Sequence, residues 1–223
     1  MTYTPIPAGQ DNWDVPVNAA FVDQDNRITT NAGAIATTNG TIDPLEVAFN
    51  PVDHGLIAWN YDPQFAAAGS GALTSGTLYM TKVKVTAAAT SNSVRYMVNA
   101  AAITPVVGQN FMALFDNAGN RVAISGDIGA TDFASIGLKN TAWVTPASVS
   151  PGYYYVALLT NAATGVNPWK TTTTVAAGLS VNLGTADVRN SSGGTGLTGL
   201  TAVPSTVTMA NRSVGSANFW SAL

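Results

Sequence analysis

The chain contains no cysteine, which excludes disulfides and thiolate metal sites. Charge is also scarce: charged residues make up 9% of the 223 residues, whereas about 25% is usual for globular proteins. The nine Lys and Arg residues are spread singly, without the basic run that a nucleic-acid footprint needs. Stability must therefore come from apolar burial and from association between chains, and nucleic acid is not an expected partner.

A secretion signal and a membrane-spanning segment are missing from the sequence pattern. The opening MTYTPIPAGQDNW has neither a basic region nor an apolar run, and no segment approaches the ~20 apolar residues of a membrane span. Hydrophobic residues nevertheless make up 46% of the chain, so it can build a core beneath a surface of neutral hydroxyl and amide groups. Such surfaces are frequent in virion and extracellular proteins. We therefore expect a virion protein that is made in the host cytoplasm, released by lysis and not inserted in a membrane.

Groups that could carry catalysis are few. The chain has one histidine, His54, which follows Asp53, and no G-x-S-x-G motif that would supply a nucleophile for a triad. Most carboxylates stand in turn contexts, and no pair suits glycoside hydrolysis. The oxygen-rich stretch 116–120 lacks the spacing of an EF-hand loop and reads as a hairpin turn. We expect no enzyme, no metal and no cofactor.

Residues 17–42 carry a seven-residue repeat. A strict heptad places apolar residues on one side of a helix only if the helix supercoils with partner helices, and polar layers fix its register. The repeat therefore predicts a short helix that forms a homotrimeric bundle. A flexible tether is the alternative, because Gly33, Gly40 and the threonine pairs are poor helix formers. The predicted seam comprises Phe21, Gln24, Ile28, Asn31, Ile35 and Ile42, with Val17 and Thr38 at further positions of the repeat.

The chain on either side of this repeat is rich in proline and turn residues. Prolines in residues 1–16 exclude a long helix or a central strand, so we expect an extended segment that docks its large aromatic, Trp13, onto another protein. Asp14 and Pro16 together favour a helix that begins near Pro16. After the repeat, Asn-Pro, Asp-Pro and Asp-His-Gly sequences predict a linker over residues 43–56.

From residue 57 to residue 223 the periodicity changes from seven to two, which is typical of β-strands. Short strands separated by turns predict a β-sandwich or jelly roll. The stretch 152–159 should be buried on both faces, and the glycine-rich stretch 188–202 should be a long mobile loop. The expected strands are 77–86, 93–99, 111–115 and 122–125 (a hairpin), 142–145, 152–159, 171–175, 179–183, 203–209 and 217–220.

Tryptophan is the most prominent candidate for ligand recognition, because aromatic faces stack on sugar rings as readily as they pack in cores. Core packing is the default for Trp59, Tyr61 and Trp220. Trp169 differs, since Asn167-Pro168-Trp169-Lys170 reads as a turn between strands. The candidate ligand-binding residues are Trp169, Trp143 and Tyr154.

Three groups of residues, in this order, carry a resemblance to a known family. They are the opening NWDVPVNAAF at 12–21 followed by QDNRI at 24–28, the hairpin FDNAGNR at 115–121 with the strand SPGYYYVA at 150–157, and the terminal NFW at 218–220. Together they resemble minor tail and fibre-like proteins of actinobacterial tailed bacteriophages, whose C-terminal halves are jelly-roll-like tips. The chain is shorter than such proteins, because no long shaft or collagen-like repeat separates the helix from the tip.

This resemblance implies a homotrimer that attaches to other virion proteins through its N-terminus and binds a host cell-surface glycan through its tip. Trp13, Pro16 and Val17 would then be the anchoring residues. A capsid decoration or head-fibre protein with a structural role is the alternative. A glycan depolymerase is a third reading, against which the missing carboxylate pair argues.

Overall fold

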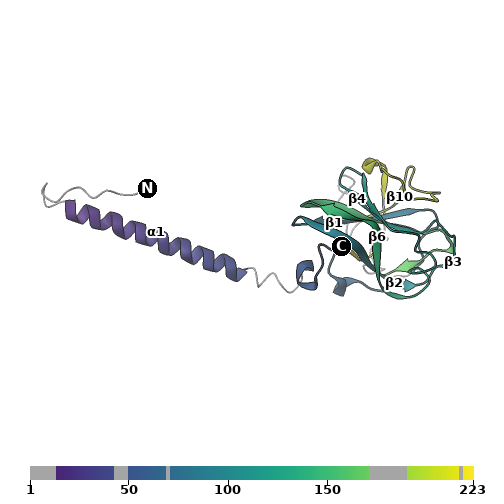
Figure 1. Ribbon diagram of the computed structural model, residues 1–223, viewed down its shortest axis with the longest axis horizontal. Helices are drawn as coiled ribbons and strands as arrows, with labels where there is room; N and C mark the ends of the chain where they lie inside the picture. The colour runs from purple at the N-terminus through teal and green to yellow at the C-terminus, as the bar shows by residue number, and fades with distance from the viewer. Residues whose placement is uncertain (1–13, 43–49, 69–70, 171–189, 216–217) are drawn as a thin grey trace. The chain divides into compact units, whose positions relative to one another are not determined.

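The computed structural model describes residues 14–42, 50–68, 71–170, 190–215 and 218–223. The chain divides into two compact units, Met1–Asn50 and Pro51–Leu223. The first contains one helix, and the second consists mainly of antiparallel strands (Figure 1). The predicted fold class, mainly β with a short N-terminal helix before a β-sandwich, is confirmed.

The elements described, in chain order, are α1 (Asp14–Ile42), η3 (Pro51–His54), η4 (Pro63–Phe65), β1 (Leu78–Val85), β2 (Ala89–Ala100), β3 (Ile103–Pro105), β4 (Phe111–Asp116), β5 (Arg121–Ile124), β6 (Gly137–Val149), β7 (Gly152–Leu159), β8 (Ala162–Thr164), β9 (Asn167–Pro168), β10 (Asn190–Gly194), η5 (Met209–Asn211), β11 (Arg212–Val214) and β12 (Ser221–Ala222).

Helix α1 is 29 residues long and begins at Asp14, three residues before the predicted start. Residues 14–16, including Pro16, therefore lie in its first turn rather than in the predicted extended segment, and Val17 is helical as predicted. A proline is tolerated there because the first backbone N–H groups have no intrahelical acceptor. Threonine also fits, since Thr29 Oγ1 and Thr30 Oγ1 donate to the carbonyls of Asp25 and Asn26, four residues earlier. The predicted extended stretch 1–13 lies outside the described residues.

Two antiparallel sheets form the sandwich. One has the strand order β11-β10-β1-β7-β4-β5, and the other has the order β12-β2-β6 with β9 also paired to β2. Residues facing the space between the sheets alternate with residues facing outward, as in Val94, Tyr96 and Val98 against Arg95 and Met97. Six of the predicted strands overlap β1, β2, β4, β5, β6 and β7, and β7 is buried on both faces beyond Tyr154 as expected.

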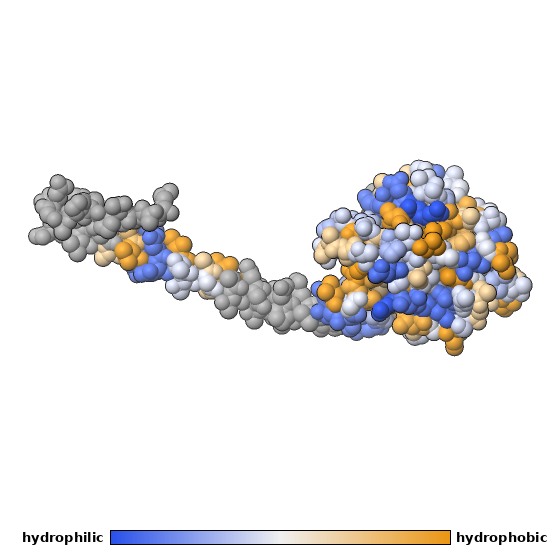
Figure 2. All heavy atoms as spheres, viewed as in Figure 1, coloured by the Kyte–Doolittle hydropathy of each residue, from blue (hydrophilic) through white to orange (hydrophobic). Residues whose placement is uncertain are grey.

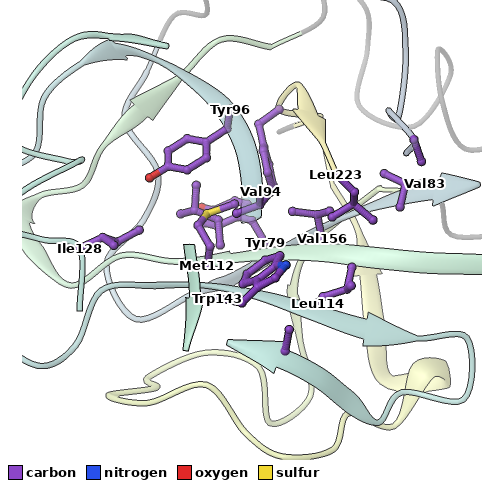
Figure 3. Packing of buried hydrophobic residues seen from close by; sticks show 14 of the residues in the cluster. Tyr79, Val83, Val94, Tyr96, Met112, Leu114, Ile128, Trp143, Val156 and Leu223 are labelled. Carbon is purple, nitrogen blue, oxygen red and sulfur yellow. The ribbon is translucent and has the colours of Figure 1, made fainter. Parts of the chain in front are cut away.

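The main core fills the space between the sheets (Figure 3). Trp143 lies there among the buried side chains, and its Nε1 donates to Ser91 Oγ at 2.9 Å. Tyr96 packs edge-on against Phe133, and its hydroxyl donates to Asp132 Oδ2 and accepts from Thr141 Oγ1. The polar ends of buried aromatic residues are thus hydrogen-bonded, as burial in an apolar core requires.

A second core covers the outer face of the six-stranded sheet. Residues 195–209 lie across that face and contribute Leu197, Val203 and Val207 to it, against Met80 and Phe115 among others. This segment corrects two predictions. Residues 190–194 form strand β10 rather than part of a long loop, and residues 203–209 form no strand but pack as an irregular cover.

A glycine allows strand β10 to pack closely against the chain before β11. Gly194 has φ +137°, and a Cβ at this position would lie 2.0 Å from the backbone oxygen of Asn211. Only a residue without a side chain allows β10 and the chain before β11 to approach so closely. The high glycine content that suggested a loop therefore serves close strand packing.

The hairpin between β4 and β5 is confirmed as a turn. Asp116 Oδ1 accepts from the Asn120 amide at 2.8 Å, and Gly119 has φ +92°. Slight burial raises the pKa of Asp116, but hydrogen bonds from Asn120 and from the amides of Ala118 and Gly119 outweigh it, so the pKa lies below its usual value. The predicted strands 171–175 and 179–183 lie outside the described residues. The terminal prediction, 217–220, leads into β12, and Phe219 bridges to Lys170.

Replacing Gly194 with alanine should lower the free energy of unfolding by about 3 kcal/mol or more, because the new Cβ overlaps the Asn211 carbonyl. Gly196 is the matched control: it has φ +74° but open space around a Cβ, so Gly196→Ala should cost only about 1 kcal/mol of backbone strain. Urea unfolding followed by circular dichroism measures both. Equal losses would show that residues 190–194 do not pack as described.

Stability should fall in strong alkali through Tyr96. Burial, and after it the neighbouring Asp132 carboxylate, raises the pKa of the Tyr96 phenol above its ordinary value. The unfolded chain then loses this proton above pH 10 while the folded chain keeps it, which costs about 1.4 kcal/mol of stability per pH unit. Tyr96→Phe should reduce the slope by about that amount between pH 10 and 11 in unfolding titrations, because the buried Tyr61 phenol still contributes, although its stability at pH 7 is lower. An unchanged slope would contradict the burial of the phenol.

Candidate functional site

An apolar pocket of about 380 Å³ lies on the outer face of the β12-β2-β6 sheet. Its floor comes from the sheet and the strand beside it, and its wall comes from residues 51–66, which precede the first strand. The floor residues are Arg95, Met97, Leu138, Trp169 and Trp220, and the wall residues are His54, Leu56, Trp59, Pro63 and Ala66. We call this site the tryptophan pocket.

Strand pairing positions the floor. Met97 and Leu138 are register partners on β2 and β6, so both side chains leave the same face of the sheet. The Trp169 amide donates to the Met97 carbonyl at 2.8 Å, and the Trp169 carbonyl accepts from the Trp220 amide at 2.9 Å. Trp169 therefore lies between strand β9 and the bridge that Lys170 makes to Phe219, and the predicted turn at 167–170 is wrong.

The wall is attached to the C-terminal strand by backbone hydrogen bonds between residues 57–60 and 221–223, by the side-chain amide of Asn60 and by an indole. Asn60 Nδ2 donates to the Phe219 carbonyl at 2.7 Å, and Asn60 Oδ1 accepts from the Ser221 amide at 3.0 Å. Trp220 Nε1 donates to the Tyr61 carbonyl at 3.1 Å. In the short helix η4, Asp62 caps the Gln64 amide. These bonds hold the wall, which carries Trp59, against the strand that carries Trp220, and both tryptophans line the cavity.

The ionisable groups of the lining are basic. They are Arg95 and His54, and the lining includes no carboxylate. The His54 ring lies 5.6 Å from that of Trp59, with the planes tilted by 39°. Behind the pocket, desolvation lowers the pKa of Lys170, whose Nζ donates to the Gly71 carbonyl at 2.8 Å, and burial raises the pKa of Tyr61. The pocket thus combines aromatic walls with a half-buried guanidinium.

The three predicted ligand-binding residues do not lie in one site. Trp169 lines the tryptophan pocket. Trp143 is 5% exposed and belongs to the main core. Tyr154 points toward the same core, and its hydroxyl accepts from the Ser150 amide at 3.0 Å. The glycine-rich stretch also lies away from Trp169, since it covers the opposite sheet.

Sequence reasoning missed most of the pocket. Trp59 and Trp220 were assigned to the core because their separation of 161 positions gives no local sign that they meet. Their place near the two ends of the β unit is the one available signal, because terminal segments of a sandwich pair often with each other. The alternation of Arg95 and Met97 with buried neighbours on β2 also marked them as outward-facing.

The second candidate surface is the predicted seam on α1. Residues 19–35 are all exposed, and Phe21, Ile28 and Ile35 retain 49%, 60% and 61% of their surface. Figure 2 shows apolar and polar residues interspersed along this part of the helix. Gln24 and Asn31 follow the same repeat. The side chain of Ile42 and the residue Trp13 lie outside the described residues.

Comparisons with models of protein families, with curated proteins and with solved structures find no match for this chain. Within the described ranges, no group of three or more His, Cys, Asp or Glu residues is placed to hold a metal ion. No described helix is long and apolar enough to cross a membrane. Function must therefore be argued from the pocket and the helix.

Two tryptophan substitutions separate core from pocket. Trp143→Ala should lower the free energy of unfolding by about 3–5 kcal/mol, because it empties a buried site. Trp169→Ala should cost clearly less, since its ring is partly exposed and borders an existing cavity. Thermal unfolding of both variants measures the difference. A larger loss for Trp169→Ala would show that the pocket is closed by further residues and is part of the core.

Proposed function

We propose that the chain is a non-enzymatic structural component of a phage virion, of the minor tail or fibre-like kind. In this proposal it is a homotrimer, residues near the N-terminus attach to other virion proteins, and the β unit binds the host surface. The division into a helical unit and a β unit supports this organisation, as does the neutral surface with 9% charged residues.

The observation that carries the proposal is the exposed heptad seam. A lone helix with Ile28 and Ile35 in solvent gains nothing from their spacing, and a helix with several threonines and glycines is only marginally stable alone. Association through the seam removes the isoleucines from water, at about 25 cal/mol for each Å² buried. Polar layers at Gln24 and Asn31 fit a bundle in which register is specified at some cost in stability.

The tryptophan pocket supports host-surface binding by the β unit. Cavities of about 300–1,000 Å³ with aromatic walls and few polar groups are typical of small-ligand sites. A glycan on the host surface is the favoured ligand class, because indole faces pack against the apolar faces of sugar rings.

A structural role as a capsid decoration or head fibre is the second candidate. The observation in its favour is the aliphatic share of the lining, with Leu56, Met97 and Leu138, which suits an apolar side chain of another virion protein. Antibody labelling of particles distinguishes head from tail. Binding of the purified chain to host cells supports the first candidate, and absence of the protein from particles would refute both.

The seam predicts a specific effect on oligomeric state. Ile28→Asp places a carboxylate in an apolar layer, so the dissociation constant of the trimer should rise by at least about a hundredfold. Val22 is the matched control, because it is 57% exposed on the same helix but lies about 100° around the axis from Phe21. Val22→Asp should leave the trimer intact.

Light scattering during size-exclusion chromatography gives the mass of each variant over a range of concentrations. A wild-type chain that stays monomeric at micromolar concentration would contradict the trimer. Equal weakening by Ile28→Asp and Val22→Asp would show that the helix associates through a different face.

A further inference from the structure

We infer that the tryptophan pocket binds a sugar ring that carries an anionic group, with the ring against the indoles and the anion on the Arg95 guanidinium. The inference deepens the proposed host-surface binding, and rests on that proposal for the source of the ligand. Its chemistry follows from two features of the lining: the aromatic surfaces and the Arg95 guanidinium, which has no ion-pair partner among the described residues.

The aromatic surfaces favour a ring. Trp59 on the wall and Trp169 and Trp220 on the floor converge on one cavity. Indole faces carry partial negative charge, and the C–H groups on a sugar ring present the complementary partial positive charge. Because the three rings are held by backbone pairing and by the Trp220 Nε1 bond to Tyr61, little side-chain freedom is lost on binding.

The cation favours an anion. Several other basic side chains of the β unit already have partners. Arg121 and Arg212 donate to backbone carbonyls, Lys139 donates to Ser135, and the Lys82 Nζ lies 4.2 Å from the Tyr153 ring centroid. Within the described part of the chain, the Arg95 side chain has no hydrogen bond, ion pair or ring contact of this kind. Its planar fork therefore remains available for bidentate binding.

The surroundings strengthen this preference. No carboxylate lines the pocket, and Asp62, beside the lining residue Pro63, is used as the cap of η4. Half-burial of Arg95 among apolar groups lowers the local dielectric, so an ion pair formed there is stronger than one in open solvent. A neutral sugar would satisfy the indoles and leave the guanidinium without a partner.

The test uses the full-length protein and small probes of matched shape. Methyl β-glucuronide and methyl β-glucoside share a ring and differ in the carboxylate, whereas acetate supplies an anion without a ring. Calorimetric titration or ligand-observed NMR should show that the glucuronide binds about tenfold or more tightly than the glucoside, because charge-assisted hydrogen bonds contribute about 1.5–3 kcal/mol. Acetate should bind more weakly than either sugar.

Variants assign the effect to the pocket. Arg95→Gln should reduce the preference for the glucuronide to near one, and Arg95→Lys should retain part of it. Trp169→Ala should weaken both sugars by about tenfold. Lys84→Gln, which removes an exposed charge on the other sheet, should change nothing.

Equal binding of the two sugars by the wild type would overturn the inference, as would a preference that survives Arg95→Gln. Failure of both sugars to bind would also overturn it, and a peptide that then binds through an apolar side chain would identify the pocket as a protein-docking site. A chain that binds host cells without these preferences refutes the ligand class alone. A chain that shows the preferences but is absent from particles refutes the virion proposal alone.

Discussion

Burial of the central strands on both faces is the constraint on which the rest of the β unit depends. In β4, in most of β7 and in the first half of β1, apolar residues face both ways, so a single partner sheet covers only half of them. The second sheet covers one face, and residues 195–209 cover the other. Exposing the outer face would leave Met80, Phe115 and Leu159 in water, each of which loses about 1.5–3 kcal/mol when unburied. The irregular cover is thus as necessary to the sandwich as either sheet.

Asparagine side-chain amides connect these layers, in place of the ion pairs that could serve the same purpose. Asn110 Oδ1 accepts from the Asn161 amide at 2.8 Å, and Asn110 Nδ2 donates to the Val106 carbonyl. Asn161 Nδ2 in turn donates to the Gln109 and Leu200 carbonyls, which ties the cover to the loops between strands. A buried amide satisfies backbone groups without the desolvation cost of an ion. The low charge and high asparagine content of the sequence are therefore two aspects of one way of linking segments.

Sequence patterns predicted the parts of the fold that local physics determines. The alternation in 77–86 and the apolar run 152–159 identified β1 and β7, and the polar residues 116–120 identified the β4–β5 hairpin. The helix followed from the heptad even though its threonines disfavour it. The patterns failed where distant segments decide the outcome. Gly194 looked like a loop residue because nothing local shows that Asn211 lies against it. Residues 203–209 alternate like a strand, but they meet the β4–β5 hairpin through an isolated bridge between Thr206 and Asn120 rather than through a ladder.

The same limit applies to the site. Trp169 was identified because its neighbours suggested exposure, but Trp143 and Tyr154 were chosen on residue type, which does not distinguish a core from a surface. Arg95 was not selected because a single arginine on a strand has no meaning until its partners are known.

The wall of the tryptophan pocket has a further consequence for the whole chain. Residues 51–66 both line the pocket and form the start of the β unit, so they are also the covalent connection to the preceding unit. They are attached to the C-terminal strand by backbone hydrogen bonds, from the Ile57 amide to the Leu223 carbonyl and from the Leu223 amide to the Ala58 carbonyl, and by the side chains of Asn60 and Trp220. Because Trp59 also bridges to Ala222, separation of the wall from the floor would break this backbone pairing as well as the Asn60 bonds. A ligand that contacts both wall and floor would oppose that separation, and by linkage any constraint that holds the wall in place would favour the ligand.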